Sequence, residues 1–376
     1  FFVQVHALLN PALPNWRTHP VVVQQHQDVI AMSRSAKALG GFKHMTPAAA
    51  RALGGVTLVH VFEEGGRVSY RPYREVSRRV MDALRGETGG VVQRLSMDEA
   101  VVDVSDDVGG GDVGARLVAG GVIGGKLRAA VLAATGVVAS VGVATSKLLA
   151  KLACRVAKSR GEPQFVMLPE AVGGVLAGLP VGRIPGCGGQ IADAFEGLGV
   201  KTAGEAQGVP MDQLEELFGA TVGARVYNDV RGQDDSEVVD AGPPHSIRSQ
   251  MSLTNVPLQR LGGGDLNPVA PWHLGQVLPV MHVVCMDLVT RVVADAAEHG
   301  RHPATLTVSV RLSQAPPRAA PVYPYPLSVT QVAVCATSFK QSQGPPISSM
   351  FPVVSKPAEE AKAPEPEPEP PAPTPT

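Results

Sequence analysis

Hydrophobic and polar positions follow two different periods along the chain, so we expect both strands and helices. Residues 305–312 (TLTVSVRL) alternate strictly, which predicts a half-buried strand with one apolar face. That face would carry Leu306, Val308, Val310 and Leu312. Ahead of it, apolar residues recur at intervals of four and three, which predicts an amphipathic helix that Pro279 should kink. The helix residues facing inward would be Leu274, Leu278, Met281, Cys285, Leu288 and Val292.

Residues 69–84 (SYRPYREVSRRVMDAL) predict another helix, with Val76, Val80 and Leu84 facing inward. The fold class is therefore α+β. Segments rich in Gly and Pro separate these elements. They are a flexible connection from Asp106 (DDVGGGDVG), an interdomain break from Asp240 (DAGPPH), and a Pro-rich loop or irregular edge strand from Gln314. A length of 376 residues suggests two or three domains.

The segment 91–105 (VVQRLSMDEAVVDVS) is rich in valine and predicts buried β-structure, yet Asp98 and Glu99 stand side by side at its centre. Burying an unpaired carboxylate is costly. The pair could therefore lie on an exposed hairpin turn, form a salt bridge, or sit on an edge strand. It could also bind a divalent metal, since Mg²⁺ takes oxygen ligands, but the backbone must then bend to bring both carboxylates together. These residues alone leave all four interpretations open.

A second segment, from Val143 to Pro163, predicts a helix with a basic face, capped by Thr145 or Ser146. The basic residues recur at intervals of 4, 4 and 3, and they are Lys147, Lys151, Arg155 and Lys158. The opposite side carries Leu148, Leu149, Leu152 and Val156. A solvated face is one interpretation. Because solvated faces usually mix signs, and this one has no acid before Glu162, a phosphate-bearing ligand is the other.

From Leu179, the sequence LPVGRIPGCGGQIADAFEGLGV places Gly186 and Gly188 around Cys187, with a short helix following. This layout is typical of a helix-hairpin-helix, whose backbone N–H groups can hold a DNA phosphate without reading sequence. The alternative is an ordinary pair of helices that uses glycines for close packing.

The composition limits the other possibilities. Hydrophobic residues make up 44% of the chain, but no apolar run approaches the roughly 20 uninterrupted residues of a membrane span, so no membrane partner is predicted. Four scattered cysteines lack zinc spacing and suit a reducing compartment. The formal charge is −1, and the Pro/Glu tail from Lys356 is acidic and predicted to be disordered. The chain opens at FFVQV without Met, so we interpret it as a fragment or partial gene model without a signal peptide.

Four segments in this order resemble the Y family of translesion DNA polymerases, and more closely its eta branch. They are LSMDEAVVDVS, SVGVATSKLLAKLACRVAKSRGE, LPVGRIPGCGG and FGATVGARVYNDVRGQDDSEV. The resemblance covers residues 1–354 and implies a right-hand polymerase. It implies fingers at 2–68, a palm at 69–162 that lacks its leading strand, and a thumb with the helix-hairpin-helix at 163–240. A βαββαβ-like little finger at 241–355 and the tail at 356–376 would follow.

The resemblance also implies residue roles. Asp98 and Glu99 match two carboxylates that hold two Mg²⁺ ions, and Ser96 lies beside them. The first metal aspartate would precede Phe1, so residues 1–376 alone are expected to be inactive. Phe2 matches the aromatic residue that excludes a 2′-hydroxyl, and Gln24 matches a contact to the templating base.

Lys158 and Lys37 would contact the triphosphate, and Lys43 would lie over the incoming base. Lys37 and Lys43 stand where the family has arginines, and Arg34 replaces a tyrosine. Lys loses the bidentate fork of Arg. Gly186 and Gly188 would contact the DNA backbone.

The implied function is low-fidelity, template-directed nucleotidyl transfer past damaged bases in DNA repair. Its partners would be primer–template DNA and deoxynucleoside triphosphates, in the nucleus. PPISSMFPVV from Pro345 suggests a last little-finger strand more than a sliding-clamp peptide. A catalytically inactive DNA-binding paralogue is the alternative, and a scaffold on the same fold is a weaker one.

Overall fold

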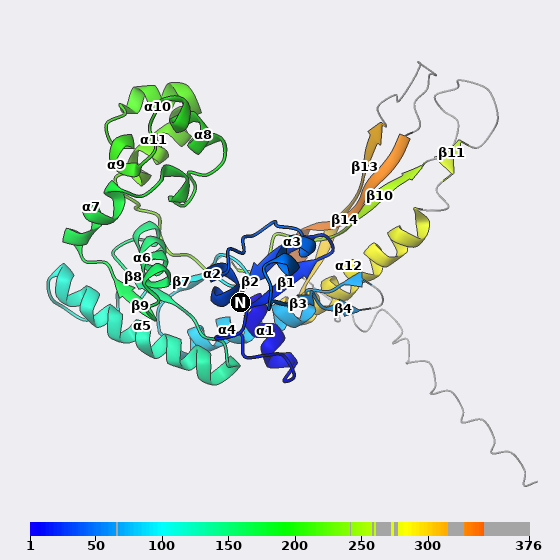
Figure 1. Cartoon of the computed structure of the whole chain (residues 1–376), viewed down its shortest axis with the longest axis horizontal. Coiled ribbons are helices and arrows are strands. Elements are labelled where there is room, and N and C mark those ends of the chain that lie inside the picture. The colour runs from blue at the N-terminus through cyan, green and yellow to red at the C-terminus, as the bar shows by residue number, and fades with distance from the viewer. Residues whose placement is uncertain are drawn as a thin grey trace, which may run out of the picture. The chain divides into compact units, whose positions relative to one another are not determined.

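The computed structural model describes residues 1–64, 67–240, 242–257, 259–260, 272–273, 277–314 and 327–341. The chain divides into two compact units, Phe1–Ala241 and Gly242–Thr376. Each unit mixes helices and strands (Figure 1), which confirms the α+β fold class.

The first part of unit one is a three-stranded sheet in the order β2–β1–β3. Strand β1 (Val21–Gln25) pairs antiparallel with β2 (Asp28–Met32) and parallel with β3 (Thr57–His60). The β-branched residues of β1 suit its buried position. Short elements surround the sheet: α1 (Phe2–Leu9), α2 (Arg34–Ala38), α3 (Pro47–Ala52), β4 (Glu63–Glu64) and β5 (Arg67–Val68).

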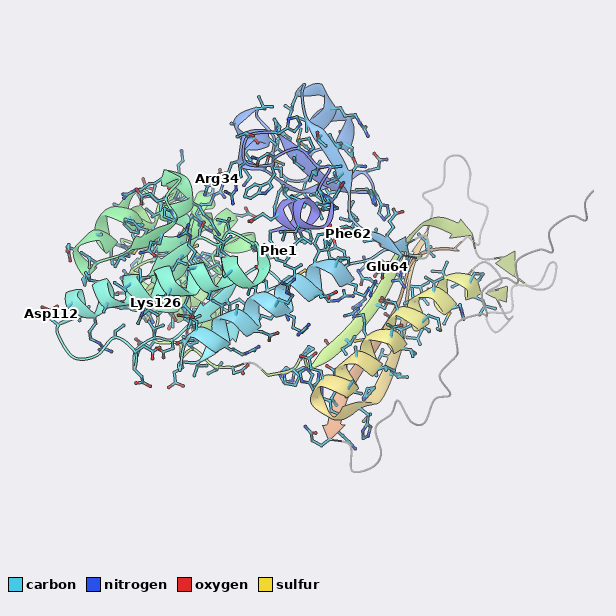
Figure 2. The ribbon with its side chains drawn as sticks, turned by 90° about the horizontal axis from the view of Figure 1, so that it is seen from below. Phe1, Arg34, Phe62, Glu64, Asp112 and Lys126 are labelled. Atoms are coloured by element: carbon cyan, nitrogen blue, oxygen red, sulfur yellow. The ribbon has the colours of Figure 1, made fainter. Side chains whose placement is uncertain are left out.

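Two long helices, α4 (Arg71–Glu87) and α5 (Val113–Thr135), lie side by side. Helix α4 confirms the helix predicted from the apolar period. Val76 is buried, and Val80 and Leu84 pack partly buried in the same cluster. Asp112, labelled in Figure 2, caps the start of α5, and its carboxylate accepts a hydrogen bond from the N–H of Ala115.

Glycines let α5 approach the strands beneath it. A Cβ atom at Gly121 would lie 2.9 Å from the Val166 side chain, and one at Gly124 would lie 3.0 Å from the Val141 side chain. Larger residues at these two positions would therefore push the helix away. By length and composition, α5 could cross a membrane, although Lys126 (Figure 2) and other basic residues interrupt its apolar run.

Two small ribbons pack against these helices. One is the antiparallel pair β6 (Val92–Arg94) and β7 (Ala100–Val102). The other is the parallel pair β8 (Val141–Val143) and β9 (Gln164–Val166), joined by helix α6 (Lys147–Arg160). The segment 91–105 is thus a hairpin instead of one continuous strand, and its turn carries the two carboxylates.

A helical region completes unit one, and Figure 1 shows its last helices gathered in one small bundle. Its elements are α7 (Pro169–Ala177), the 3-10 turn η1 (Val181–Arg183), α8 (Gln190–Gly197), α9 (Ala203–Ala206), α10 (Met211–Phe218) and α11 (Ala220–Asp229). Leu152, Phe195 and Leu214 are nearly inaccessible in its core. The first helix of the expected helix-hairpin-helix is only the short η1.

Unit two contains β10 (Ser246–Pro257), α12 (Leu278–His299), β13 (Arg301–Gln314) and β14 (Leu327–Gln341). The three strands form an antiparallel sheet in the order β10–β14–β13, and β11 (Gln259–Arg260) pairs with β12 (Trp272–His273). Apart from the short β11 and β12, this β–α–β–β order matches the first four of the six elements in the expected little-finger pattern. The Pro-rich segment after Gln314, the predicted last strand at 345–354 and the tail lie outside the described residues.

Two predictions for unit two are wrong in detail. Pro279 lies in the first turn of α12, where a missing N–H breaks no helical hydrogen bond, so it causes no kink there. Leu306, Val308 and Val310 are 65%, 53% and 43% exposed. The row is exposed because the apolar contacts of α12 go to β10 and β14. Leu278 is exposed as well, and Leu274 lies outside the described residues.

A buried histidine ties α1 to α4. The Nε2 atom of His6 lies 2.7 Å from the Tyr73 hydroxyl, and its ring stacks on Phe62 (labelled in Figure 2) with centroids 4.3 Å apart. Burial, followed by the nearby charge of His60, lowers the pKa of His6 to about 4. His6 therefore stays neutral at pH 7.

We expect the free energy of unfolding to fall as the pH drops from about 6.5 to about 4. Over that range the unfolded chain binds a proton that folded His6 does not. The loss should be no more than about 3 kcal/mol. Urea unfolding at several pH values measures it. His6→Gln cannot titrate, so its stability should depend less on pH; an equal slope in both proteins would contradict this.

Candidate functional site

The turn of the β6–β7 hairpin bends the backbone at Asp98 and Glu99. The N–H groups of Leu95 and Ser96 donate to the Glu99 carbonyl at 2.9 and 3.0 Å, which closes the turn. The Ser96 hydroxyl lies 2.9 Å from Asp98 Oδ1 and accepts from the Asp98 N–H at 3.2 Å. Ser96 therefore holds the Asp98 carboxylate in place, and its expected position beside the metals stays a prediction.

Glu99 forms a salt bridge with a helix residue. The Lys151 ammonium lies 2.8 Å from Oε1 and 3.0 Å from Oε2 of Glu99. The two side chains are 37% and 39% exposed, so the pair is only partly screened by water. Two of the structural interpretations of the carboxylate pair are thus observed together, the hairpin turn for both residues and the salt bridge for Glu99.

Both carboxylates line a cavity of about 360 Å³. Strands β7 and β8 and helices α4, α5 and α6 surround it, and Lys151 and Lys158 of α6 reach it as well. Apolar residues such as Met81 and Leu127 form another part of the wall. Arg128 of α5 lines it too, so the cavity combines an apolar interior with two acidic and three basic residues.

Helix α6 is fixed at its beginning by two side chains. Ser146 accepts a hydrogen bond from the Leu149 N–H, which confirms the predicted cap, and the Asp234 carboxylate accepts from the Leu148 N–H at 2.9 Å. Leu148, Leu149 and Leu152 are buried, as predicted. These contacts set the rotation of α6 and therefore where its basic face points.

That basic face is more than a solvated surface. Lys147 donates to the Gln93 side-chain oxygen at 3.2 Å and to the Glu237 carbonyl at 2.6 Å. Arg155 donates to the Arg183 carbonyl. Burial, followed by the nearby charge of Arg183, lowers the pKa of Arg155. At least three of the four basic residues therefore have defined protein partners.

The structure brings several predicted nucleotide-binding residues together at the start of α1. The Phe1 nitrogen lies in the electrostatic field of Asp98, Lys158, Lys43 and Lys37. Arg34, labelled with Phe1 in Figure 2, has its Nη1 atom 3.8 Å from where a Cβ atom of Gly161 would lie, at the end of α6. Lys37 and Lys43 from one part of the chain and Lys158 from α6 thus all lie close enough to the Phe1 nitrogen to influence its charge.

Phe2 and Gln24 occupy different surroundings. The Phe2 ring contacts Tyr73 and Tyr70, with centroids 4.6 and 6.0 Å apart, so a packing role alone explains its position. Gln24 lies on β1, and its buried side-chain oxygen has no hydrogen-bond partner among the described residues. A buried polar atom of this kind usually finds a partner, and a ligand is one source. The predicted roles of both residues stay predictions.

The glycine turn ahead of α8 is not among the residues that line the cavity. Gly186 has a φ of +81°, a left-handed conformation that favours glycine. Arg225 of α11 donates to the Gly186 carbonyl at 3.2 Å and to Asp229 at 2.6 Å, which fixes the turn. A Cβ atom at Gly188 would meet nothing within 4 Å, so this face of the turn is open.

Asp98 and Glu99 suit magnesium in donor chemistry, since this ion takes one or two carboxylates and completes its shell with water and phosphate oxygens. Within the described ranges, no group of three or more His, Cys, Asp or Glu residues could hold a metal. The two carboxylates therefore fit as part of a magnesium site. Sequence reasoning missed the Lys151 contact to Glu99, although the unbalanced basic face of α6 was a signal of an acidic or anionic partner.

Comparison with known proteins places these features in one family. Residues 1–155, which include the carboxylate hairpin, match the impB/mucB/samB family, and residues 182–234, which include the glycine turn, match the DNA polymerase-iota thumb domain. DNA polymerase IV of Neisseria meningitidis serogroup B (strain ATCC BAA-335 / MC58) is 34% identical over 192 residues, which are 51% of this chain and 57% of that protein.

Human DNA polymerase iota is 30% identical over 282 residues, which are 67% of this chain and 37% of that protein. DNA polymerase IV of Methanoculleus marisnigri (strain ATCC 35101 / DSM 1498 / JR1) is 35% identical over 166 residues, 44% of this chain and 43% of that protein. The chain spans about half the length of the polymerase IV relatives it matches. These relatives carry the names IV and iota, so the closer match to the eta branch is not supported. The two family matches and these relatives together show that the chain is a homologue of the Y-family translesion DNA polymerases.

Proposed function

We propose that this chain forms most of a DNA-directed DNA polymerase that copies damaged templates. The observation that carries the proposal is the hairpin turn that presents Asp98 and Glu99 to a cavity shared with Lys158. Lys37 and Lys43 add positive charge near the Phe1 nitrogen, which also lies in the field of Asp98. Carboxylates at this site can bind metal ions, and lysines can bind phosphate groups. Such a site suits a deoxynucleoside triphosphate as substrate and primer–template DNA as partner.

Each residue has a distinct part in this proposal. Bound magnesium ions would supply charge stabilisation for the 3′-oxygen and the leaving pyrophosphate. Ser96 orients the Asp98 carboxylate through their hydrogen bond. Lys158 and Lys37 bind the triphosphate as point charges, Lys43 and Arg34 lie near the incoming nucleotide, and Phe2 excludes its 2′-hydroxyl.

The domain layout is also part of the proposal. We assign fingers to 2–68, palm to 69–162, thumb to 163–240 and little finger to 241–355. The division between the two compact units at Ala241 and the thumb match within 182–234 support it. The β–α–β–β order of unit two supports a little finger. Nuclear localisation rests on the resemblance alone, and binding to a sliding clamp rests on the segment from Pro345, which lies outside the described residues.

The two strands that line the cavity are evidence for a further palm strand ahead of Phe1. Strand β7 pairs with β6 and β8 pairs with β9, and among the described residues neither has a partner on its other side. Both strands line the cavity, and the Phe1 nitrogen lies in the field of Asp98. A strand that enters between β7 and β8 would continue into α1 and could bring a third carboxylate to the site.

A catalytically inactive DNA-binding paralogue is the second candidate function. It is favoured by the ion pair between Glu99 and Lys151, because that pair neutralises one of the two carboxylates without any metal. Lys37 also lacks the bidentate fork that an arginine would offer the triphosphate, and Lys43 lacks the planar guanidinium that an arginine would lay over the base.

The strand proposal predicts a gain in stability when the residues encoded immediately before Phe1 are restored. New main-chain hydrogen bonds to β7 and β8 contribute about 1 kcal/mol each, which should raise Tm by about 10 °C in total. Differential scanning calorimetry measures the change. A Gly-Ser extension of equal length is the control, and an equal Tm for both extensions would show that no strand is inserted.

The catalytic proposal predicts that Asp98→Asn, made in the extended protein, lowers primer extension by about 100-fold or more, because it removes charge that stabilises the transition state. DNA affinity and Tm should change little, since the exposed carboxylate has Ser96 as its hydrogen-bonding partner. Asp106→Asn, on an exposed loop, is the matched control. A lower Tm with normal turnover would indicate a structural role, and an inactive parent would favour the paralogue.

The DNA-binding proposal predicts that affinity for primer–template falls steeply with salt and depends little on sequence, because backbone phosphates are the main contacts. Removing unit two, Gly242–Thr376, should weaken binding and reduce the salt dependence. Fluorescence anisotropy measures both, and circular dichroism checks that residues 1–241 remain folded. Equal affinity in the two proteins would argue against a DNA-binding little finger.

A further inference from the structure

The Lys151–Glu99 pair places a permanent cation on an expected metal ligand. Both oxygens of Glu99 lie within 3.0 Å of the Lys151 ammonium. Two carboxylate oxygens that face one ammonium cannot at the same time face a magnesium ion at its usual 2.0–2.1 Å distance without bringing two cations together. The Lys151 ammonium and a metal ion therefore compete for the Glu99 carboxylate.

The position of Lys151 is built into the fold. Leu148, Leu149 and Leu152 bury the opposite side of α6, and Ser146 and Asp234 fix its first turn. The hairpin turn fixes Glu99 through its own carbonyl. Both partners thus stand on anchored backbone, so the ion pair is more than a chance meeting of two long surface side chains.

Neighbours on the same helix face have different partners. Lys147, one turn earlier, donates to the neutral oxygens of Gln93 and Glu237, and Arg155, one turn later, donates to the Arg183 carbonyl. Lys151 is the member of this row that forms an ion pair with a carboxylate of the proposed metal site. The row therefore supplies a control with the same charge and nearly the same position.

We propose that Lys151 is a positioning residue that holds Glu99 while no metal is bound, and that metal binding requires its ammonium to leave the carboxylate. The inference rests on the proposed function, which makes Glu99 a metal ligand. It adds that the chain weakens its own affinity for divalent cations. The released ammonium stays in the cavity that it shares with Lys158, where an incoming triphosphate would offer it a new anionic partner.

The test measures Mn²⁺ binding to residues 1–376 without DNA or nucleotide, from the electron paramagnetic resonance signal of the free ion. Lys151→Gln should bind Mn²⁺ on the order of tenfold more tightly than the parent, because a cation next to the ligand is gone. Lys147→Gln removes the same charge one turn away and should change the affinity much less. Lys151→Arg keeps the ion pair and should keep the affinity low.

Substitution of Glu99 completes a double-mutant cycle with Lys151. In a Glu99→Gln background, Lys151→Gln should no longer change Mn²⁺ affinity, because the two residues act through one contact. Thermal melting with a chelator checks that every variant is folded. If Lys151→Gln fails to fold, the comparison of Lys151→Arg with the parent carries the test, and a tenfold gain in affinity there would overturn the inference.

The outcomes separate the inference from the proposed function. If Glu99→Gln weakens Mn²⁺ binding but Lys151→Gln does not strengthen it, the metal role stands and the inference is overturned. If Glu99→Gln has no effect, both are overturned. Equal gains for Lys151→Gln and Lys147→Gln would show a general charge effect, and absence of binding in every protein would also overturn the inference.

Discussion

The free-energy cost of removing two adjacent carboxylates from water determines how the hairpin and helix α6 are arranged in unit one. Asp98 and Glu99 cannot both enter an apolar interior, so the segment that carries them turns outward instead of continuing as a strand. The turn gives Asp98 a hydroxyl partner and Glu99 an ammonium partner. Helix α6, which supplies that ammonium, must therefore pass close to the hairpin, and its leucine side and its caps determine that path.

Close packing of α5 against β8 and β9 also helps to keep α6 near the two carboxylates. The glycine face of α5 lets the helix approach β8 and β9, so the parallel pair and its crossover α6 stay near the carboxylates. A bulky residue at Gly121 or Gly124 would displace the strands together with the helix that follows β8. The acidic turn and the glycine face, although far apart in sequence, thus serve one arrangement.

Local signals in the sequence predicted helices and caps well. The period of α4, the leucine side of α6 and its Ser146 cap were all readable because each depends on neighbours within a few residues. Predictions that needed tertiary packing were less accurate. Strict alternation predicted a half-buried strand with Leu306, Val308 and Val310 on its covered face, but alternation does not tell which strands a helix covers. The Pro279 kink was wrong because the start of α12 was placed too early.

The same limit applies to the site. Asp98, Glu99 and Lys158 could be named in advance, but that Lys151 binds Glu99 depends on how α6 is rotated relative to a hairpin 52 residues away. That rotation follows from tertiary anchors such as Asp234, which no local pattern connects with α6. Resemblance to a family supplied residue roles, whereas the ion pair became visible only with coordinates.

The glycine turn contains one feature whose use lies outside catalysis. Cys187 is completely buried, and burial raises the pKa of its thiol to about 11, whereas Cys154, Cys285 and Cys335 are partly accessible. A thiolate is the reactive form, so a thiol reagent can modify Cys187 only when this region opens. Cys187 can therefore serve as a probe of local unfolding. The rate at which its thiol is labelled reports how often the surrounding helices open.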